Sequence, residues 1–383
     1  MAPVGTRTSS PTARLEQFST RIVFFVAGFG MAAWAPLVPF AKARVGIDEG
    51  VLGLLLLCLG IGSIVAMPLA GVLATRLGCR LVVTGSALLL CLALPLLASV
   101  STLPLLVAAL LVFGAGVGAL DVSMNIQAII VERASGRSMM SGFHGLFSLG
   151  GIVGAAGTTA LLGAGATPLA ATLVVVAGIL VALAASARHL LPYGGKGAGP
   201  TFAIPHGIVL FIGVLAFIVF MAEGAVLDWS AVFLTSSRGM AAAYAGLGYA
   251  AFALTMTIGR LAGDRVVGRF GGPAIIVFGG SCAAVGFALG ALLPSWQATL
   301  LGYALVGVGC SNIVPVLFTS VGRQTAMPES IAVPAITTLG YAGILAGPAA
   351  IGFVAHAASL PTAFAIVALL LLAVAASGRM LRL

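Results

Sequence analysis

Long apolar runs separated by short polar segments dominate this chain. A helix that crosses a bilayer needs about 20 mainly apolar residues, and the chain divides into twelve such stretches at its charged residues, prolines and glycine clusters. Six precede the polar interruption LPYGGKGAGPTFAIP, and six follow it. The predicted spans are 21–41, 50–74, 81–100, 104–131, 139–163, 168–190, 206–234, 242–263, 273–293, 297–321, 332–355 and 360–377. This pattern predicts an all-α membrane protein with two six-helix halves.

The same pattern divides the chain into four parts. Residues 1–20 are rich in Pro, Ser and Thr and lack the apolar core of a signal peptide, so we expect a disordered tail. Residues 21–190 form the predicted N-terminal half, and 206–383 form the C-terminal half. Residues 191–205 are the expected linker between them.

Composition narrows the class of protein. The chain is 61% hydrophobic and 7% charged, a balance that soluble globular domains do not have. Its net charge of +9 comes from scattered Lys and Arg residues, without a basic helix or an aromatic-basic platform, so no nucleic-acid partner is expected. The five cysteines include no closely spaced pair, so neither a metal site nor a redox centre is expected. The sequence shows no phosphate-binding loop, nucleophile-base pair or dinucleotide fingerprint, and we predict that it is not an enzyme.

The basic residues predict the orientation in the membrane. Short cytoplasmic segments retain Lys and Arg, whereas the opposite side is depleted of them. With the N-terminus inside, only Lys42, Arg44 and Arg238 fall outside. Arg260 is predicted to lie on the cytoplasmic side, in the basic turn that ends the eighth span. We therefore expect a monomeric, multi-pass protein of a bacterial inner membrane, with both termini and the linker in the cytoplasm.

Related basic turns follow the second and eighth spans, GVLATRLGCR (Gly71 to Arg80) and GRLAGDRVVGR (Gly259 to Arg269). With the 6+6 layout, they resemble the major facilitator superfamily, although Thr75 stands where that family usually has an acid. The resemblance implies a substrate site between two halves at mid-membrane, lined by helices 1, 4, 5, 7, 10 and 11. It also implies a cytoplasmic gate or tether, for which the candidates are Arg76, Arg80, Glu132, Asp264, Arg265 and Arg269.

A narrower resemblance covers GALDVSMNIQAIIVERASGRSMMSGFHGLFSLGG (Gly118 to Gly151), which is similar to transporters of the YbjJ type, distantly related to fucose permeases. It implies a solute transporter, often coupled to protons, without implying a substrate. The fourth helix lacks the arginine, and the fifth the proline, that many drug:proton antiporters carry. Drug export is therefore less favoured.

Ionisable residues inside predicted spans are the candidates for chemistry, because a charge facing lipid costs roughly 2.5 to 3.5 kcal/mol even on insertion scales. Asp121, Asn125 and Glu132 lie on one stripe of the fourth helix. Asp121 is expected to carry the coupling proton or bind a polar substrate group, the alternative being a structural hydrogen-bond network. Glu132 is expected to pair with Arg133, Arg137 or Arg80. His144 either relays protons to Asp121 or only hydrogen-bonds its neighbours.

The C-terminal half offers a second set of candidates. Glu223 lies near the centre of the seventh helix and is the second candidate for a proton or substrate site. Asp228 points about 140° away, so it is treated separately, as an outer gate residue or an interface residue beside Arg238. Asn312, followed by Pro315 in the tenth helix, predicts a substrate-binding kink with a freed backbone carbonyl.

Trp34 and Trp229 lie near the outer ends of the first and seventh helices. With Asp228 they are the candidates for lining the substrate site. Trp34 would either stack on a sugar or aromatic ring or anchor the helix at the membrane interface, and the anchor is favoured. Together these features predict a secondary active transporter of a small organic solute that works by alternating access. Proton-coupled uptake of a sugar or metabolite is favoured, with sodium coupling as the alternative. The competing hypotheses are proton-antiport efflux and a non-transporting receptor or scaffold. The expected partners are the solute and the bilayer, with a proton gradient and no cofactor.

Overall fold

The computed structural model describes residues 11–47, 49–195, 204–241, 244 and 246–381. Its first half is built from α1 (Pro11–Ala32), η1 (Ala35–Leu37), α2 (Val38–Val45), α3 (Glu49–Leu77), α4 (Cys79–Ser99), α5 (Leu103–Ser135), α6 (Met140–Gly163), α7 (Pro168–Ser186) and η2 (Ala187–His189). The second half contains α8 (Gly207–Val232), η3 (Phe233–Ser237), α9 (Leu247–Phe270), α10 (Gly272–Leu292), α11 (Trp296–Cys310), α12 (Ile313–Arg323), α13 (Glu329–Ala357) and α14 (Leu360–Ser377).

Every predicted span has a helical counterpart, and the predicted all-α membrane fold is confirmed. Within the described residues, eleven helical spans are long and apolar enough to cross a membrane. The remaining predicted span is α9, whose apolarity is lowered by Arg260 and Asp264. The first span combines α1, η1 and α2, and the tenth combines α11 and α12.

The predicted disordered tail is wrong for residues 11–20, which form the first turns of α1. The residues before them lie outside the described part. Gln17, Ser19 and Thr20 are buried, and the Gln127 side chain of α5 donates a hydrogen bond of 3.0 Å to the Thr20 hydroxyl. This packing against α5 holds Thr20 inside the bundle, so α1 begins before the first apolar residues of the predicted span.

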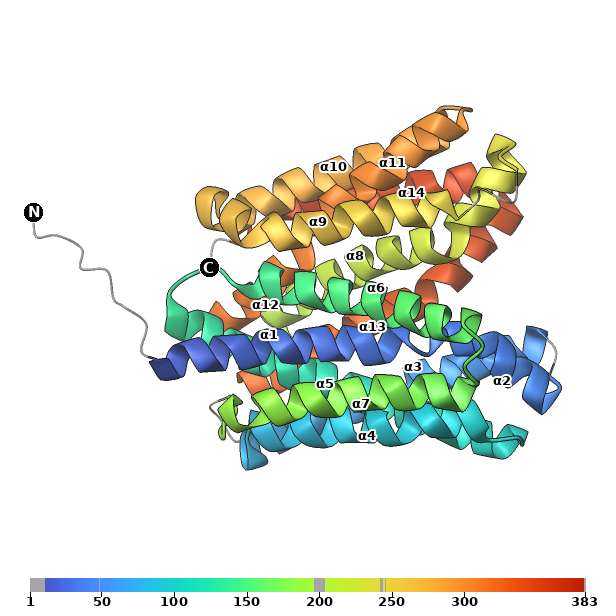
Figure 1. The fold of residues 1–383 in the computed structure, drawn as a ribbon. Helices are drawn as coiled ribbons and strands as arrows, with labels where there is room; N and C mark the ends of the chain where they lie inside the picture. Colours follow the sequence, from blue (N-terminus) through green and yellow to red (C-terminus); the bar gives the residue numbers. More distant parts are fainter. Residues whose placement is uncertain (1–10, 48, 196–203, 242–243, 245, 382–383) are drawn as a thin grey trace, which may run out of the picture.

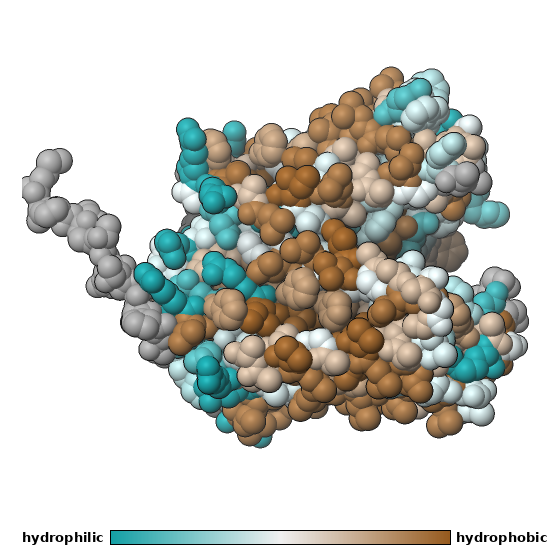
Figure 2. All heavy atoms as spheres, in the orientation of Figure 1, coloured by the Kyte–Doolittle hydropathy of each residue, from teal (hydrophilic) through white to brown (hydrophobic). Residues whose placement is uncertain are grey.

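The long helices run side by side. The first described residues, in α1, and the last, after α14, lie at the same end of the bundle, at the left of Figure 1, which is therefore the end near the termini. In the first half α1 packs on α6 and α3 on α5, while in the second half α8 packs on α13. The two halves meet through α6 with α9 and through α3 with α13. An apolar band covers the middle of the bundle, and hydrophilic residues gather at its ends (Figure 2).

Glycines allow the helices within each half to approach closely. A Cβ at Gly150 of α6 would collide with the Phe25 carbonyl oxygen of α1, and a Cβ at Gly154 would collide with that of Phe29. In the second half, a Cβ at Gly343 of α13 would collide with the Phe217 carbonyl of α8. Small residues at such crossings let backbones touch, so each half packs as a tight unit.

Candidate functional site

Three of the predicted site residues form one hydrogen-bonded chain between α5 and α6. Asn125 donates from Nδ2 to Asp121 Oδ1 at 3.0 Å and to the Asp121 carbonyl at 2.8 Å. Its Oδ1 lies 3.2 Å from His144 Nε2. Asn125 and His144 are buried, whereas Asp121 is partly exposed. The one-turn spacing on α5 places the acid and the amide on one face, and the packing of α6 brings the imidazole to them.

Aromatic rings enclose His144 from both halves of the molecule. The Phe24 ring of α1 lies 5.3 Å from the imidazole centroid in an edge arrangement. The Phe318 ring of α12 lies 5.6 Å away and belongs to the second half. The imidazole therefore lies at the boundary between the halves.

A buried ion pair forms the centre of the second cluster. Arg260 Nη2 lies 3.5 Å from Glu223 Oε1, and the Glu223 side chain is 15% exposed. Arg260 also donates from Nη1 to the Ser148 hydroxyl of α6 at 2.9 Å. One guanidinium thus connects an acid of its own half with a hydroxyl of the other half.

The assignment of Arg260 to a cytoplasmic turn is wrong. Helix α9 continues for ten residues beyond Arg260, to Phe270, which places the side chain about 15 Å from that helix end. The side chain is buried in the bundle. The missed signal was Glu223, because a buried charge needs a counterion and an intramembrane acid therefore indicates a nearby base.

The predicted kink in the tenth span is present. Helix α11 ends at Cys310 and α12 begins at Ile313. Pro315 has no N–H for the Ser311 carbonyl, its partner in a continuous helix, and that carbonyl accepts from Arg260 Nε at 3.3 Å. Asn312, in the break itself, donates to the Gly259 carbonyl of α9 at 3.0 Å. The kink therefore organises the arginine site.

The two clusters are joined through α6. The Ser148 hydroxyl donates to the His144 carbonyl at 3.2 Å and accepts from Arg260. Hydrogen bonds therefore connect Asp121 through Asn125 to the His144 side chain. The His144 carbonyl is in turn connected through the Ser148 hydroxyl to Arg260 of the ion pair. The structure thus brings together Asp121, Asn125, His144, Glu223 and Asn312 with Arg260, which the sequence analysis had not included.

The outer candidates lie apart from this network. Trp34 is only 5% exposed, so the favoured interpretation as a lipid-interface anchor is wrong: its ring packs in the hydrophobic core. Trp229 is partly buried and packs against Gly352 of α13. Asp228 is exposed, and no ion pair within the described chain joins it to Arg238. Arg238 instead donates to the Gly290 carbonyl at 2.6 Å and to that of Ala291 at 3.2 Å.

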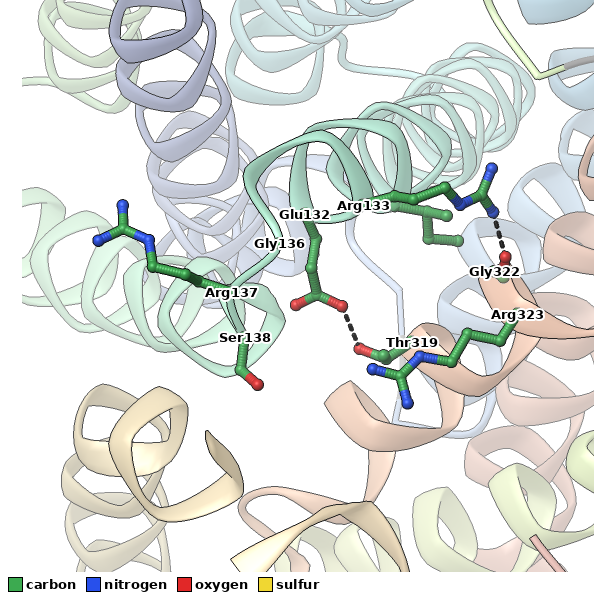
Figure 3. Close-up of a pocket in the computed structure, with 9 residues that line it drawn as sticks. Glu132, Arg133, Gly136, Arg137, Ser138, Thr319, Gly322 and Arg323 are labelled. Atoms are coloured by element: carbon green, nitrogen blue, oxygen red, sulfur yellow. Dashed lines mark hydrogen bonds between the residues drawn. The ribbon is translucent and has the colours of Figure 1, made fainter. Parts of the chain in front are cut away.

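At the end of the bundle that carries the termini, Glu132 makes contacts different from those expected. Its Oε2 accepts from the Met139 and Met140 amides at 2.7 Å each, and its Oε1 accepts from the Thr319 hydroxyl at 2.6 Å. The expected pairing with Arg133, Arg137 or Arg80 is wrong, because the unpaired amides at the start of α6 attract the carboxylate more closely. Figure 3 shows Glu132 reaching Thr319 across the gap between the halves.

Arg133 and Asp264 also connect the halves at this end. Arg133 of α5 bonds the Gly322 carbonyl and the Glu329 carboxylate, both of the second half. Asp264 of α9 accepts from the Gly142 amide in the first turn of α6 at 3.0 Å. The halves are therefore fastened together where the termini lie. At the opposite end the surface is hollowed between them (Figure 2).

The other gate candidates make no connection between the halves in the described structure. Arg80 donates from Nε to the Leu190 carbonyl at 2.9 Å and from Nη2 to the Arg188 carbonyl at 2.8 Å, both in its own half. Arg76 and Arg265 are exposed, and Arg269 lies over the Phe270 ring. Arg80 thus ties α4 to the segment after α7.

Two cavities open at the end that carries the termini. One, of about 260 Å³, is lined by Glu132, Arg133, Arg137 and Arg323 among others (Figure 3). The other, of about 630 Å³, includes Arg21, Arg137, Asp264 and Arg265. Neither includes Asp121 or Glu223. Among the described residues, no group of three His, Cys, Asp or Glu side chains is placed to hold a metal ion.

A bundle of membrane-length helices in two halves, with an ionisable network buried between them, defines a polytopic membrane protein of the transporter class. The sequence model of the Major Facilitator Superfamily matches residues 22–323, and the chain belongs to this superfamily. Its fold and family point to a transporter rather than an enzyme.

Relatives and solved structures agree with this assignment. An uncharacterised MFS-type transporter of Yersinia pestis is 57% identical, with 95% of each chain covered. Membrane protein MosC of Rhizobium meliloti is 31% identical, with 94% of this chain and 88% of MosC covered. The fold is similar to that of FucP, the E. coli fucose:proton symporter, in its outward conformation, with a TM-score of 0.81 and 17% identity over 97% of this chain and 100% of FucP.

Proposed function

We propose that this protein is a proton-coupled secondary transporter that moves a small organic solute by alternating access. The observation that supports the proposal best is the polar network around Arg260. That guanidinium lies between Glu223 of its own half and Ser148 of the other half. Because Arg260 contacts both the acid Glu223 and a residue of the other half, protonation of Glu223 can influence how the two halves move relative to each other.

The chemistry follows from charge balance. A charged Glu223 compensates Arg260, and a proton on Glu223 leaves the guanidinium without a counterion in a poorly solvated place. Arg260 then favours a new acceptor, such as a polar group of the solute. The hydrogen bond from Arg260 to Ser148 must break when the two halves separate around these residues. Proton binding, solute binding and opening of the bundle therefore affect one another.

The first half supplies a second site for a proton or a solute group. Asp121 is partly exposed and bonded to Asn125, which contacts His144. The imidazole contacts Phe318 of the second half, so the charge state of this chain also depends on how the halves meet. A carboxylate, an amide and aromatic rings are suited to hydroxyl-rich or other polar metabolites, and FucP, of similar fold, is a fucose:proton symporter.

The proposed location is a bacterial inner membrane, with both termini in the cytoplasm and the protein acting as a monomer. The basic residues near the termini support this orientation. The end where Asp264 and Arg133 join the halves is then cytoplasmic, and the hollow at the other end faces outward. Uptake is the direction that we propose.

The test begins with a thermal-shift screen of the purified protein against sugars, other metabolites and drugs. A ligand found there is then used in proteoliposomes with an imposed pH gradient, with Glu223→Gln and Asp121→Asn as variants. Ser123→Ala is the matched control, because that buried hydroxyl bonds only backbone of its own helix. We expect gradient-driven accumulation in the parent and the control and its loss in both variants. Flux that ignores the pH gradient, or follows a sodium gradient, contradicts proton coupling.

A further inference from the structure

The larger cavity at the end of the bundle that carries the termini is lined by three arginines and a single acid. Arg21 of α1, Arg137 after α5 and Arg265 of α9 all line this space of about 630 Å³, and Asp264 is the acid beside them. All three arginine side chains are exposed. Within the described structure, none of their guanidinium groups has a hydrogen-bond or ion-pair partner. The cavity therefore presents a net positive charge to a ligand from outside.

An apolar stripe on α9 leads to this cavity along the outer surface of the protein. Leu254, Ile258 and Leu261 are 59%, 58% and 45% exposed, and their spacing of four and three residues puts them on one face. Arg265 follows Leu261 by four residues and continues the same face. Leu261 and Arg265 both line the cavity, so the stripe and the basic cavity are continuous.

A stripe of exposed apolar side chains on a membrane-length bundle is suited to contact with lipid acyl chains. Its side chains are exposed on the protein surface. Helix α9 lies on the same side of the bundle as α1 and α6 in Figure 1, and Figure 2 shows apolar residues along the middle of that view and hydrophilic ones at the end near the termini. Because Leu261 and the three arginines line one cavity, the apolar stripe ends at the arginines. Lipid headgroups lie at such a boundary between apolar and charged protein surface.

We propose that this cavity and stripe bind one anionic glycerophospholipid from the leaflet on the side of the termini. The phosphate lies among Arg21, Arg137 and Arg265, and an acyl chain follows Leu261, Ile258 and Leu254. Guanidinium groups bind phosphate oxygens through paired, charge-assisted hydrogen bonds. A free phosphate ion would use the arginines but not the stripe, which is why a lipid fits the whole feature.

The bound lipid also bears on conformation. Arg21 and Arg137 belong to the first half, whereas Arg265 belongs to the second. A phosphate held by all three joins the halves at the same end as the Asp264 contact with Gly142. Binding therefore favours the conformation in which this end is closed.

The experiment measures lipid binding to the purified full-length protein by native mass spectrometry. The probes are phosphatidylglycerol, phosphatidylcholine with the same acyl chains, and sodium phosphate. Arg21→Gln, Arg137→Gln and Arg265→Gln are combined in one variant, and Arg379→Gln, an exposed arginine at the end of the chain, is the matched control. Ile258→Asn tests the stripe separately. Thermal unfolding of each variant without lipid shows that it is folded.

We expect phosphatidylglycerol to bind the parent and the Arg379→Gln control alike, and more tightly than phosphatidylcholine. Each arginine near an anionic lipid contributes roughly fivefold in affinity, so the triple variant should bind about a hundredfold more weakly. Ile258→Asn should also weaken binding. The proposal is overturned if the triple variant keeps its affinity, or if phosphatidylcholine binds as tightly. It is also overturned if millimolar phosphate displaces the lipid while Ile258→Asn has no effect, because a free anion is then the ligand.

Discussion

Arg260 Nε lies 3.3 Å from the Ser311 carbonyl oxygen, the carbonyl that Pro315 leaves without a helical donor. A proline in one helix thus creates the acceptor that orients a buried arginine of another. Because the same guanidinium also bonds Ser148 and pairs with Glu223, the break between α11 and α12 is part of the proposed coupling site.

Pro315→Ala tests this relationship. The alanine supplies an N–H for Ser311, so α11 and α12 should join into a straighter helix and Arg260 should lose an acceptor. A proline inside a helix costs about 3 kcal/mol, so we expect the variant to be at least as stable as the parent in thermal unfolding. Its solute flux in proteoliposomes should fall severalfold. Unchanged flux would contradict a role for the break.

The ion pair of Arg260 with Glu223 predicts that the effects of replacing its two partners on stability are strongly non-additive. Removing one partner of a buried pair leaves an uncompensated charge and costs roughly 3 kcal/mol. Glu223→Gln and Arg260→Gln should each lower the free energy of unfolding by about that amount, and the double variant by much less than their sum. Asp228→Asn, at an exposed acid on the same helix, should change it by less than about 0.5 kcal/mol. Additive losses in the double-mutant cycle would show that the pair contributes nothing as a pair.

The hydrogen-bonded chain from Asp121 through Asn125 to His144 predicts that replacing Asn125 destabilises the protein. Asn125→Leu leaves His144 Nε2 and Asp121 Oδ1 without their shared partner, and a buried unsatisfied polar group costs about 1 to 3 kcal/mol. We expect that loss of stability in Asn125→Leu, together with reduced proton-driven flux, and a smaller change in the Ser123→Ala control. Equal stability of the two variants would rule out a structural chain through Asn125.

The contacts of Asp264 and Arg133 at the end near the termini predict that removing them makes the cavities there more accessible to solvent. Asp264→Ala with Arg133→Gln removes hydrogen bonds that join the halves. In a cysteine-free background, a cysteine placed at Ser138, which lines both cavities, should then react severalfold faster with a hydrophilic maleimide. Arg76→Gln, at an exposed arginine of the same end, should leave the rate unchanged. An unaltered rate in the double variant would mean that these contacts do not hold this end closed.

Two glycines of α6 predict opposite responses to the same substitution. A Cβ at Gly150 would collide with the Phe25 carbonyl oxygen, whereas a Cβ at Gly157 meets nothing within 4 Å. Overpacking costs about 1 to 3 kcal/mol, so Gly150→Ala should lower the unfolding temperature. Gly157→Ala should leave it unchanged or raise it, because alanine favours helix. Similar effects at both positions would contradict the close crossing of α1 and α6.

The sequence alone determined the class of protein and the number of spans. The need for about 20 apolar residues per crossing is a local requirement, so each span could be found without knowing its neighbours. The relation of Asp121 to Asn125 was equally local, because one turn of helix places them on one face. Residues 11–20 were misjudged because their helix depends on a distant contact, Gln127 with Thr20.

Only the tertiary structure decided which polar groups meet. Glu132 has two arginines nearby in sequence, Arg133 and Arg137, yet it bonds the first amides of α6 and Thr319 of the other half. Arg260 was assigned to a basic turn because Gly and Arg cluster there, but the packing of α8 and α11 against α9 surrounds it with Glu223 and the Ser311 carbonyl. Periodicity fixes the face on which a residue lies, whereas its partner depends on how helices from distant parts of the chain cross.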